Sequence, residues 1–298
     1  MRNAVAPRPV RSPTQAPGAG IGLRLPHLAE VATDAPPVSW LEIHPENFLA
    51  NPHSRELLAQ IAMNYPISLH TVGISIGSAD GIDRIHLRRL KVLADDLDPF
   101  LVSGHLAWSS VGGRYLNDLL PIPYDAASLQ LVASHLDEVQ QVLGRAYLVE
   151  NPASYVGFGH STMSEIEFLS ELVDRTACKL LCDISNLYIS GVNMGFDPYD
   201  YVDAFPADAV AALHLGGFTA EADAGHGGEI LIDTHDNAIS DAVWSLYEHA
   251  LGKFGPKPTL IEWDQALPDL STLLSEAEHA DRIAGRIDEE RELHAVAG

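Results

Sequence analysis

The sequence predicts an α/β protein built as a single (β/α)8 barrel. Short β-type segments alternate with helical periodicity along almost the whole chain, and eight such β-type segments are present. The length of 298 residues is also typical of one barrel. No linker or change of composition interrupts residues 18–298. We therefore expect a flexible, basic, Pro-rich tail over residues 1–17 and one barrel domain over residues 18–298.

The β-type segments are short apolar or alternating runs, and helical patterns fill the stretches between them. In chain order the expected strands are Ile21–Arg24, Trp40–His44, Ile67–His70, Leu101–Leu106, Ala146–Glu150, Lys179–Asp183, Ala211–Leu215 and Thr259–Glu262. The expected helices are Arg55–Asn64, Ile82–Leu97, Ala126–Leu143, Ser164–Asp174, Ala238–Lys253 and a closing helix from Leu270 to about Leu293. Ser54 and Asp125 stand before two of these helices as capping residues.

The charge is strongly unbalanced, because 18 Lys and Arg face 41 Asp and Glu, for a formal net charge of −23. Such a field repels phosphate backbones and anionic lipids, which argues against nucleic acid or a membrane as the partner. Cys178 and Cys182 are spaced by four in an apolar run. On one strand they lie too far apart to form a disulfide, so we interpret them as buried packing residues. With no secretory signal and no long apolar run, the cytoplasm is the expected location.

The most informative pattern in the sequence is the type of residue at the C-terminal ends of the expected strands. Six consecutive strands carry a His or a carboxylate at or near their C-terminal ends: His70, His105, Glu150, Asp183, His214 and Glu262. In a barrel these ends converge on the mouth where active sites are built. Each of the six stands two positions after another candidate inward-facing residue, so alternation turns all of them toward the barrel axis.

This cluster favours a metal site at the C-terminal mouth. Unpaired carboxylates are costly in a partly buried pocket, and we expect no nearby Lys or Arg to neutralise them. Imidazole and carboxylate ligands without thiolate suit iron, manganese or zinc. The set exceeds the needs of one ion, so at least two ions bridged by Glu150 are expected. The spacing of His70, His105 and Glu150 is compatible both with an oxygen-activating iron site and with a two-metal hydrolase.

Further polar residues follow the strands. Asp233 and His235 stand two apart, so in an extended segment their side chains point the same way, and Asn186 offers a carbonyl oxygen three positions after Asp183. Candidates for substrate contacts or for orienting the ligands are Glu46, Asn47, Trp108, Asn151 and His226. Trp108 is equally compatible with a packing role, and His226 with a ligand, a substrate contact or an ordinary loop position.

Eight segments of the chain resemble, in order and spacing, the DUF692 family of multinuclear non-haem iron-dependent oxidases. These segments are WLEIHPENF, SLHTVGISIG, SGHLAW, LVENP, LCDISNLY, LHLGGF, LIDTHD and LIEWD, and together they extend over roughly residues 18–280. Members of the family include the methanobactin and bufferin maturation enzymes, which are TIM barrels with two or three irons. The resemblance is greatest to the bufferin type, whose products are copper-binding peptides.

The resemblance implies a catalytic barrel and a specific ligand set. A first iron would be held by His70, His105 and Glu150, and a second by Glu150, Asp183, His214 and Glu262. A third, more labile iron would use Asn186, Asp233 and His235. The implied reaction uses O2 and mixed Fe(II)/Fe(III) centres to modify cysteine residues of a ribosomally made precursor peptide. A small partner protein that presents the peptide is implied as well.

Two alternatives remain open on the residues alone. Divalent-metal isomerases and hydrolases of the xylose isomerase and endonuclease IV type also carry Glu, His and Asp at their strand ends. Against an endonuclease stands the net charge of −23, and against a sugar isomerase stands the absence of a lysine at the expected strand ends. A non-catalytic barrel that binds metal or peptide is the second alternative.

Overall fold

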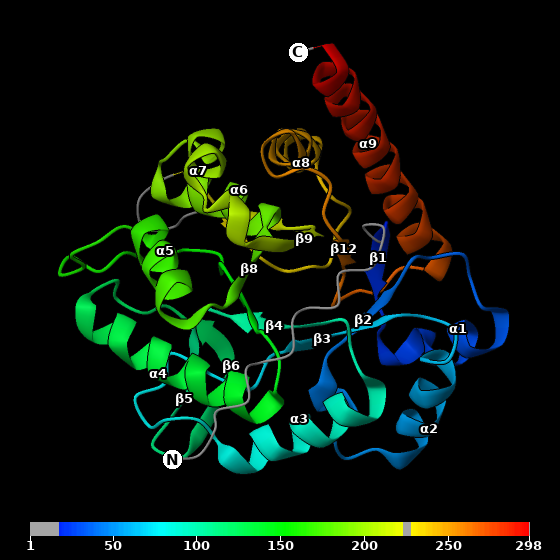
Figure 1. Ribbon diagram of the computed structural model, residues 1–298, viewed down its shortest axis with the longest axis horizontal. Coiled ribbons are helices and arrows are strands. Elements are labelled where there is room, and N and C mark those ends of the chain that lie inside the picture. The colour runs from blue at the N-terminus through cyan, green and yellow to red at the C-terminus, as the bar shows by residue number, and fades with distance from the viewer. Residues whose placement is uncertain (1–17, 223–227, 298) are drawn as a thin grey trace.

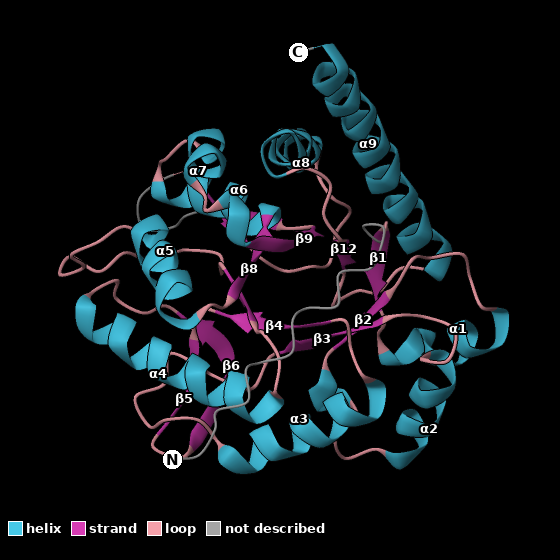
Figure 2. Cartoon of the chain, viewed as in Figure 1, coloured by secondary structure: helices cyan, strands magenta, loops and turns pink. Residues whose placement is uncertain are grey.

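A closed barrel of eight parallel strands forms the centre of the protein. The computed structural model describes residues 18–222 and 228–297. The strands follow one another around the barrel in the order β1-β12-β9-β8-β7-β4-β3-β2, surrounded by helices (Figures 1 and 2). They are β1 (Ala19–Gly22), β2 (Leu41–Ile43), β3 (Ile67–Thr71), β4 (Leu101–His105), β7 (Leu148–Glu150), β8 (Lys179–Asp183), β9 (Val210–Gly216) and β12 (Thr259–Glu262). The predicted barrel is confirmed, while the tail predicted for residues 1–17 lies outside the described residues.

The helices lie between the strands and on the outside of the barrel. They are α1 (Leu28–Asp34), α2 (Pro52–Ile61), α3 (Arg84–Leu97), α4 (Ala126–Leu143), α5 (Glu165–Thr176), α6 (Ile184–Met194), α7 (Pro198–Ala204), α8 (Asp241–Phe254) and α9 (Leu270–Ala297). Short 3-10 turns occupy Leu25–His27, Pro45–Asn47 and Ala207–Ala209. Helix α9 packs beside β1 and α8, and its C-terminal part extends away from the barrel (Figure 1). Within the described ranges, no helix combines the length and the hydropathy needed to cross a bilayer.

Helix boundaries follow the capping residues, with one correction to the sequence prediction. Asp125 caps α4 as predicted, since its side chain accepts a hydrogen bond from the Ser128 amide. Ser54 does not cap α2, because the helix begins earlier at Pro52 and Asn51 accepts the Ser54 amide. Proline suits this first helical position, where its missing N–H costs nothing.

Two β-hairpins outside the barrel were not predicted. β5 (Trp108–Val111) pairs with β6 (Arg114–Leu120) after strand β4, and β10 (Thr219–Ala222) pairs with β11 (Glu229–Ile232) after strand β9. Gly112 and Gly113 form the turn of the first hairpin at φ values of 60° and 69°, which glycine adopts without strain. Both hairpins follow C-terminal strand ends and therefore stand at the mouth of the barrel.

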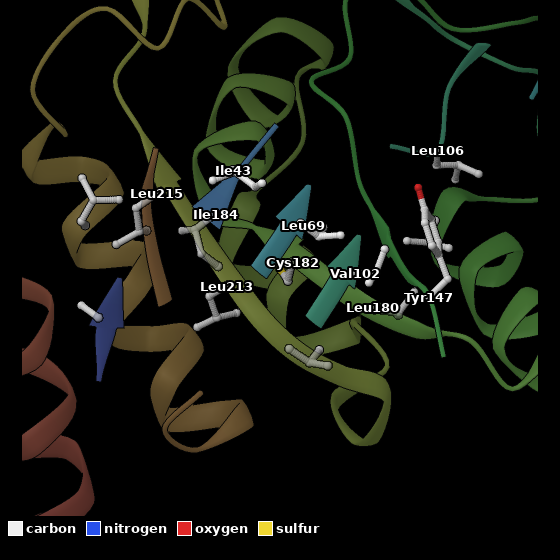
Figure 3. Packing of buried hydrophobic residues seen from close by; sticks show 14 of the residues in the cluster. Ile43, Leu69, Val102, Leu106, Tyr147, Leu180, Cys182, Ile184, Leu213 and Leu215 are labelled. Atoms are coloured by element: carbon white, nitrogen blue, oxygen red, sulfur yellow. The ribbon is translucent and has the colours of Figure 1, made fainter. Parts of the chain in front are cut away.

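The main core lies between the outer face of the barrel and the helices (Figure 3). Its strand residues include Ile43, Leu69, Val102, Leu180 and Leu213. Both cysteines are buried in this layer without a disulfide, as predicted. Because side chains alternate along a strand, the residues between these face the barrel axis. A small apolar cluster of Leu101, Leu148, Leu181 and Ala212 lies among them. The next inward-facing positions are polar.

Candidate metal centre

The six strand-end residues predicted from the sequence converge at the barrel mouth. The parallel ladders set this arrangement, since the register pairs His105 with Glu150 and Asp183 with His214. Five of the six are buried, and His70, Asp183 and His214 are 0% exposed. Such complete burial of ionisable groups requires strong compensation from hydrogen bonds, opposite charges or a metal ion.

His70, His105 and Glu150 form a first group of ligand atoms. Nε2 of His70 lies 3.1 Å from Nε2 of His105, and Oε2 of Glu150 lies 3.3 Å and 3.5 Å from these two nitrogens. Two imidazole nitrogens bound at right angles to one ion stand roughly 3 Å apart, given metal–nitrogen distances of about 2.1 Å. Ser103 Oγ lies 2.8 Å from Nδ1 of His70, which fixes the orientation of that ring.

Glu150 also belongs to a second group, formed with Asp183, His214 and Glu262. One ligand atom from each of these four residues lies within 4.8 Å of the others. Oε2 of Glu262 is 2.9 Å from Nδ1 of His214, and Oε1 of Glu150 is 3.7 Å from the same nitrogen. The two oxygens of Glu150 thus face different groups, as a bridging carboxylate requires.

Asp233 and His235 approach each other beside these groups. Oδ1 of Asp233 lies 2.8 Å from Nε2 of His235. The predicted reason for this pairing is wrong, because the segment is not extended: β11 ends at Ile232, and His235 adopts a left-handed φ of 47°. Asn186 lines the same cavity as both residues. Gly216 is required behind His235, because a Cβ there would lie 2.5 Å from the imidazole ring.

Many buried polar atoms at the mouth have no hydrogen-bond partner within the described part of the protein. They are Glu42 Oε1, Glu150 Oε2, Asp183 Oδ2, Asn186 Oδ1 and His214 Nε2. Buried polar groups are rarely left unpaired, since each costs about 1–3 kcal/mol. All five are oxygen or imidazole nitrogen atoms, the donor types that iron, manganese and zinc accept. The residues present therefore fit divalent metal ions.

The pKa values indicate how poorly this cluster tolerates its own charges without an ion. Burial raises the pKa of Glu150 well above its ordinary value and raises that of Asp183 to about 7, with a further contribution from the negative charge of Asp233. Burial lowers the pKa of His105 to about 4, so its ring is neutral at pH 7. A neutral imidazole has a free lone pair for a metal ion.

An arginine at the mouth corrects the expectation that no cation stands near the acids. Nε of Arg24, which follows β1, donates a 2.5 Å hydrogen bond to Oδ1 of Asp264, and Nη2 lies 3.7 Å from Glu262 Oε1. The same guanidinium is 3.2 Å from Nε2 of His44. Arg24 therefore neutralises only the edge of the cluster, on the side of Asp264. Among the described residues its ion pairs are with Glu262 and Asp264 and not with Glu150 or Asp183.

Sequence reasoning missed three further ligand-type residues: Glu42, His44 and Asp264. Glu42 lies near His70 and His214, and His44 lies near Glu262 and Asp264. The two-residue alternation would have found Glu42 and His44 on β2, where Trp40 is buried two positions before Glu42. It would equally have found Asp264, two positions after Glu262.

The residues predicted to orient ligands or contact substrate fall into different places. Asn151 holds Asp183, since its amide donates to the Asp183 carbonyl and accepts the Asp183 N–H, both at 3.0 Å. Glu46 and Asn47 line a neighbouring cavity instead of the metal centre. The indole of Trp108 donates to the Pro121 carbonyl and packs against the core. His226 lies outside the described residues.

Two adjoining cavities open at this mouth. The one at the metal centre has a volume of about 330 Å³, and the larger neighbour measures about 680 Å³. They share Val72, Tyr115 and Asn117, and the Tyr115 hydroxyl donates to the Val72 carbonyl. The β5–β6 hairpin thus forms a common wall, which leaves room for an extended molecule to reach the metal centre from the side.

Fold and site together define a TIM-barrel protein with several adjoining groups of potential metal ligands at its mouth. A family model described as RiPP precursor modification enzyme MbnB/TglH/ChrH matches residues 18–285. The chain therefore belongs to this family, which acts on precursors of ribosomally synthesised and post-translationally modified peptides (RiPPs). It is 47% identical to a UPF0276 protein of Vibrio parahaemolyticus over 273 residues, which is 91% of this chain and 94% of that protein. A UPF0276 protein of Rhizobium meliloti is 45% identical over 90% of this chain and 87% of its own length.

Solved structures of similar fold are sugar-converting and related barrels. An L-ribulose 3-epimerase matches with a TM-score of 0.57 and 16% identity, over 94% of this chain and 98% of its own. A xylose isomerase-like TIM barrel protein from Mycobacterium smegmatis, solved in complex with magnesium, matches with a TM-score of 0.56 and 15% identity, over 83% of this chain and 84% of its own. At such low identity the likeness extends to the fold alone.

Proposed function

We propose that this protein is a multinuclear non-haem iron oxidase that uses O2 to modify cysteine residues of a ribosomally synthesised precursor peptide. Membership of the RiPP-modifying family supports a peptide substrate. The position of Glu150 supports the proposed multinuclear metal centre, because its two oxygens face separate groups of imidazole and carboxylate side chains. Further residues of the mouth, chiefly Asp233 and His235, would supply donors for a third ion.

The ligand groups divide among two or three irons in mixed Fe(II)/Fe(III) states. His70, His105 and Glu150 would hold the first ion, and Glu150, Asp183, His214 and Glu262 the second. A third would use Asn186, Asp233 and His235. Bound iron would supply one-electron redox chemistry with O2 and Lewis-acid binding of a substrate thiolate.

The other residues of the mouth would orient the metal-binding side chains, bind the peptide and exclude water. Ser103 fixes the ring orientation of His70, and Asn151 holds the backbone of Asp183. The cavity walled by the β5–β6 hairpin has room for the peptide segment beside the target cysteine. A side chain that enters the 330 Å³ cavity from there displaces water and holds its reactive atoms near the ligands. A small partner protein would present the peptide, and the cytoplasm would keep its thiols reduced.

Co-expression with a small cysteine-containing reading frame beside the gene tests this function. We expect the mass of the peptide to change at a cysteine, and the purified protein to contain two or three irons. His105→Ala and Glu150→Ala are expected to abolish modification while the barrel stays folded by circular dichroism. An unchanged peptide mass despite iron-loaded protein and the correct partner would refute the oxidase, and full activity in either variant would refute the ligand assignment.

A further inference from the structure

Glu42 is the buried carboxylate of the mouth to which the proposed iron sites give no role. It belongs to β2 and is 1% exposed. Its Oε2 accepts a 2.8 Å hydrogen bond from Ser68 Oγ. Its other oxygen, Oε1, is buried without a hydrogen-bond partner. A buried carboxylate with one free oxygen is costly unless it serves another group.

That free oxygen faces the ring of His214 on the side away from the proposed second ion. Oε1 of Glu42 lies 3.5 Å from Nε2 of His214, which is itself buried and unpartnered. On the other side of the ring, Nδ1 faces Glu262 at 2.9 Å and Glu150 at 3.7 Å. Most of the carboxylates near this histidine therefore converge on Nδ1, and only Glu42 faces Nε2.

We infer that Glu42 is a positioning residue that holds His214 with Nδ1 directed at the metal centre. A histidine that binds a metal through one nitrogen commonly donates the N–H of the other to a carboxylate, which fixes the ring and strengthens the ligand. Here Nε2–H would donate to Glu42 Oε1, and Ser68 would hold Glu42 in turn. The inference rests on the metal sites of the proposed function and requires no assumption about the peptide.

The first measurement is iron retention. Wild-type protein and the variants Glu42→Leu, Glu42→Gln and Ser68→Ala are loaded anaerobically with Fe(II), desalted and exposed to a chromogenic Fe(II) chelator. Loss of an outer-shell partner typically weakens metal binding about 10- to 100-fold, so we expect Glu42→Leu to release iron at least about tenfold faster. Glu42→Gln is expected to stay closer to wild type, because its amide oxygen accepts the same N–H. Ser68→Ala, which removes only the hydrogen bond that holds Glu42, is expected to release iron at a rate between those of wild type and Glu42→Leu.

The second measurement separates positioning from a structural role. Loss of Glu42 also removes a buried partner of His214 and Ser68, so the readout is the rise in melting temperature that Fe(II) causes, which should be smaller for Glu42→Leu than for wild type. Wild-type iron release from Glu42→Leu, or a rise in its melting temperature with Fe(II) equal to that of wild type, would overturn the inference. So would a Glu42→Gln variant that binds one iron fewer from the outset, because Glu42 would then be a direct ligand. Wild-type protein that binds no iron would instead refute the proposed function itself.

Discussion

At the scale of single residues, alternation within short strands accounts for most of the site. The convergence of the six strand-end residues was predictable because each follows an inward-facing residue by two positions, and a barrel brings such residues to one mouth. The same rule, applied to β2, reaches Glu42 and His44. The left-handed backbone of His235 was not predictable from the local sequence. The His235 N–H bonds to the Gly217 carbonyl and its ring lies against Gly216, and neither glycine is a neighbour of His235 along the chain.

Gly216 provides a test of the third ligand group. Any side chain at this position meets the His235 ring, since a Cβ would lie 2.5 Å from it. We expect Gly216→Ala to displace His235 and to lower the iron content by about one ion per chain, while the fold persists. Elemental analysis and circular dichroism measure both effects. Gly252→Ala on α8 is the control, because nothing lies within 4 Å of a Cβ there. Full iron content in Gly216→Ala would contradict the assignment of His235.

At the scale of elements, the barrel strands and long amphipathic helices were predictable, and the inserted elements were not. The prediction for α4 matched at both ends because Asp125 caps it and Gly144 follows it in a left-handed conformation. Helix α6 escaped prediction because it is buried on most sides, which removes the polar face that reveals helical periodicity. The β5–β6 strands are short and largely exposed, so they lack an alternating apolar pattern.

The β5–β6 hairpin is expected to govern peptide binding without affecting the metal. Tyr115 lines both cavities and is 53% exposed, so its ring is available to a bound peptide. We expect Tyr115→Ala to raise the KM for the precursor about tenfold, equivalent to about 1.4 kcal/mol, with unchanged iron content. Val111→Ala in the same hairpin is the control, since Val111 is 45% exposed but lines neither cavity. A wild-type KM for Tyr115→Ala would exclude this wall from the peptide site.

Glu165, the first residue of α5, predicts a pH dependence of stability. Its carboxylate accepts hydrogen bonds from Tyr124 at 3.0 Å and Tyr201 at 2.6 Å, yet burial raises its pKa. A carboxyl group with a raised pKa in the folded state stabilises the fold most below its unfolded pKa of about 4.3, and this contribution is lost as pH rises through the folded pKa.

The pH effect is measured on metal-free protein by urea unfolding between pH 4 and pH 7. Wild type should lose stability relative to Glu165→Gln as pH rises, by about 1.4 kcal/mol for each unit of pKa shift. Glu171→Gln, on the exposed face of the same helix, should run parallel to wild type. A constant difference between wild type and Glu165→Gln across this range would show that the carboxyl has an ordinary pKa.

At the scale of the whole molecule, the net charge of −23 includes a concentration of buried acids at the barrel mouth. Arg24 offsets it on the side of Asp264, and bound metal ions would add positive charge beside Glu150 and Asp183. Ions that bind only the folded state stabilise it by mass action, by about 2.7 kcal/mol at a free concentration of 100 Kd. We therefore expect iron removal to lower the thermal midpoint, and Fe(II) added without oxygen to restore it.

Glu150→Gln distinguishes this electrostatic account from a general effect of iron. The substitution replaces a carboxyl group whose pKa is raised by burial with a neutral amide of similar shape, so the metal-free variant should be at least as stable as metal-free wild type. The same substitution weakens both sites, so Fe(II) should raise its thermal midpoint much less than that of wild type. Scanning calorimetry of both proteins, with and without Fe(II), measures the two differences. Equal stabilisation of wild type and Glu150→Gln by Fe(II) would mean that the ions bind elsewhere than at the bridging carboxylate.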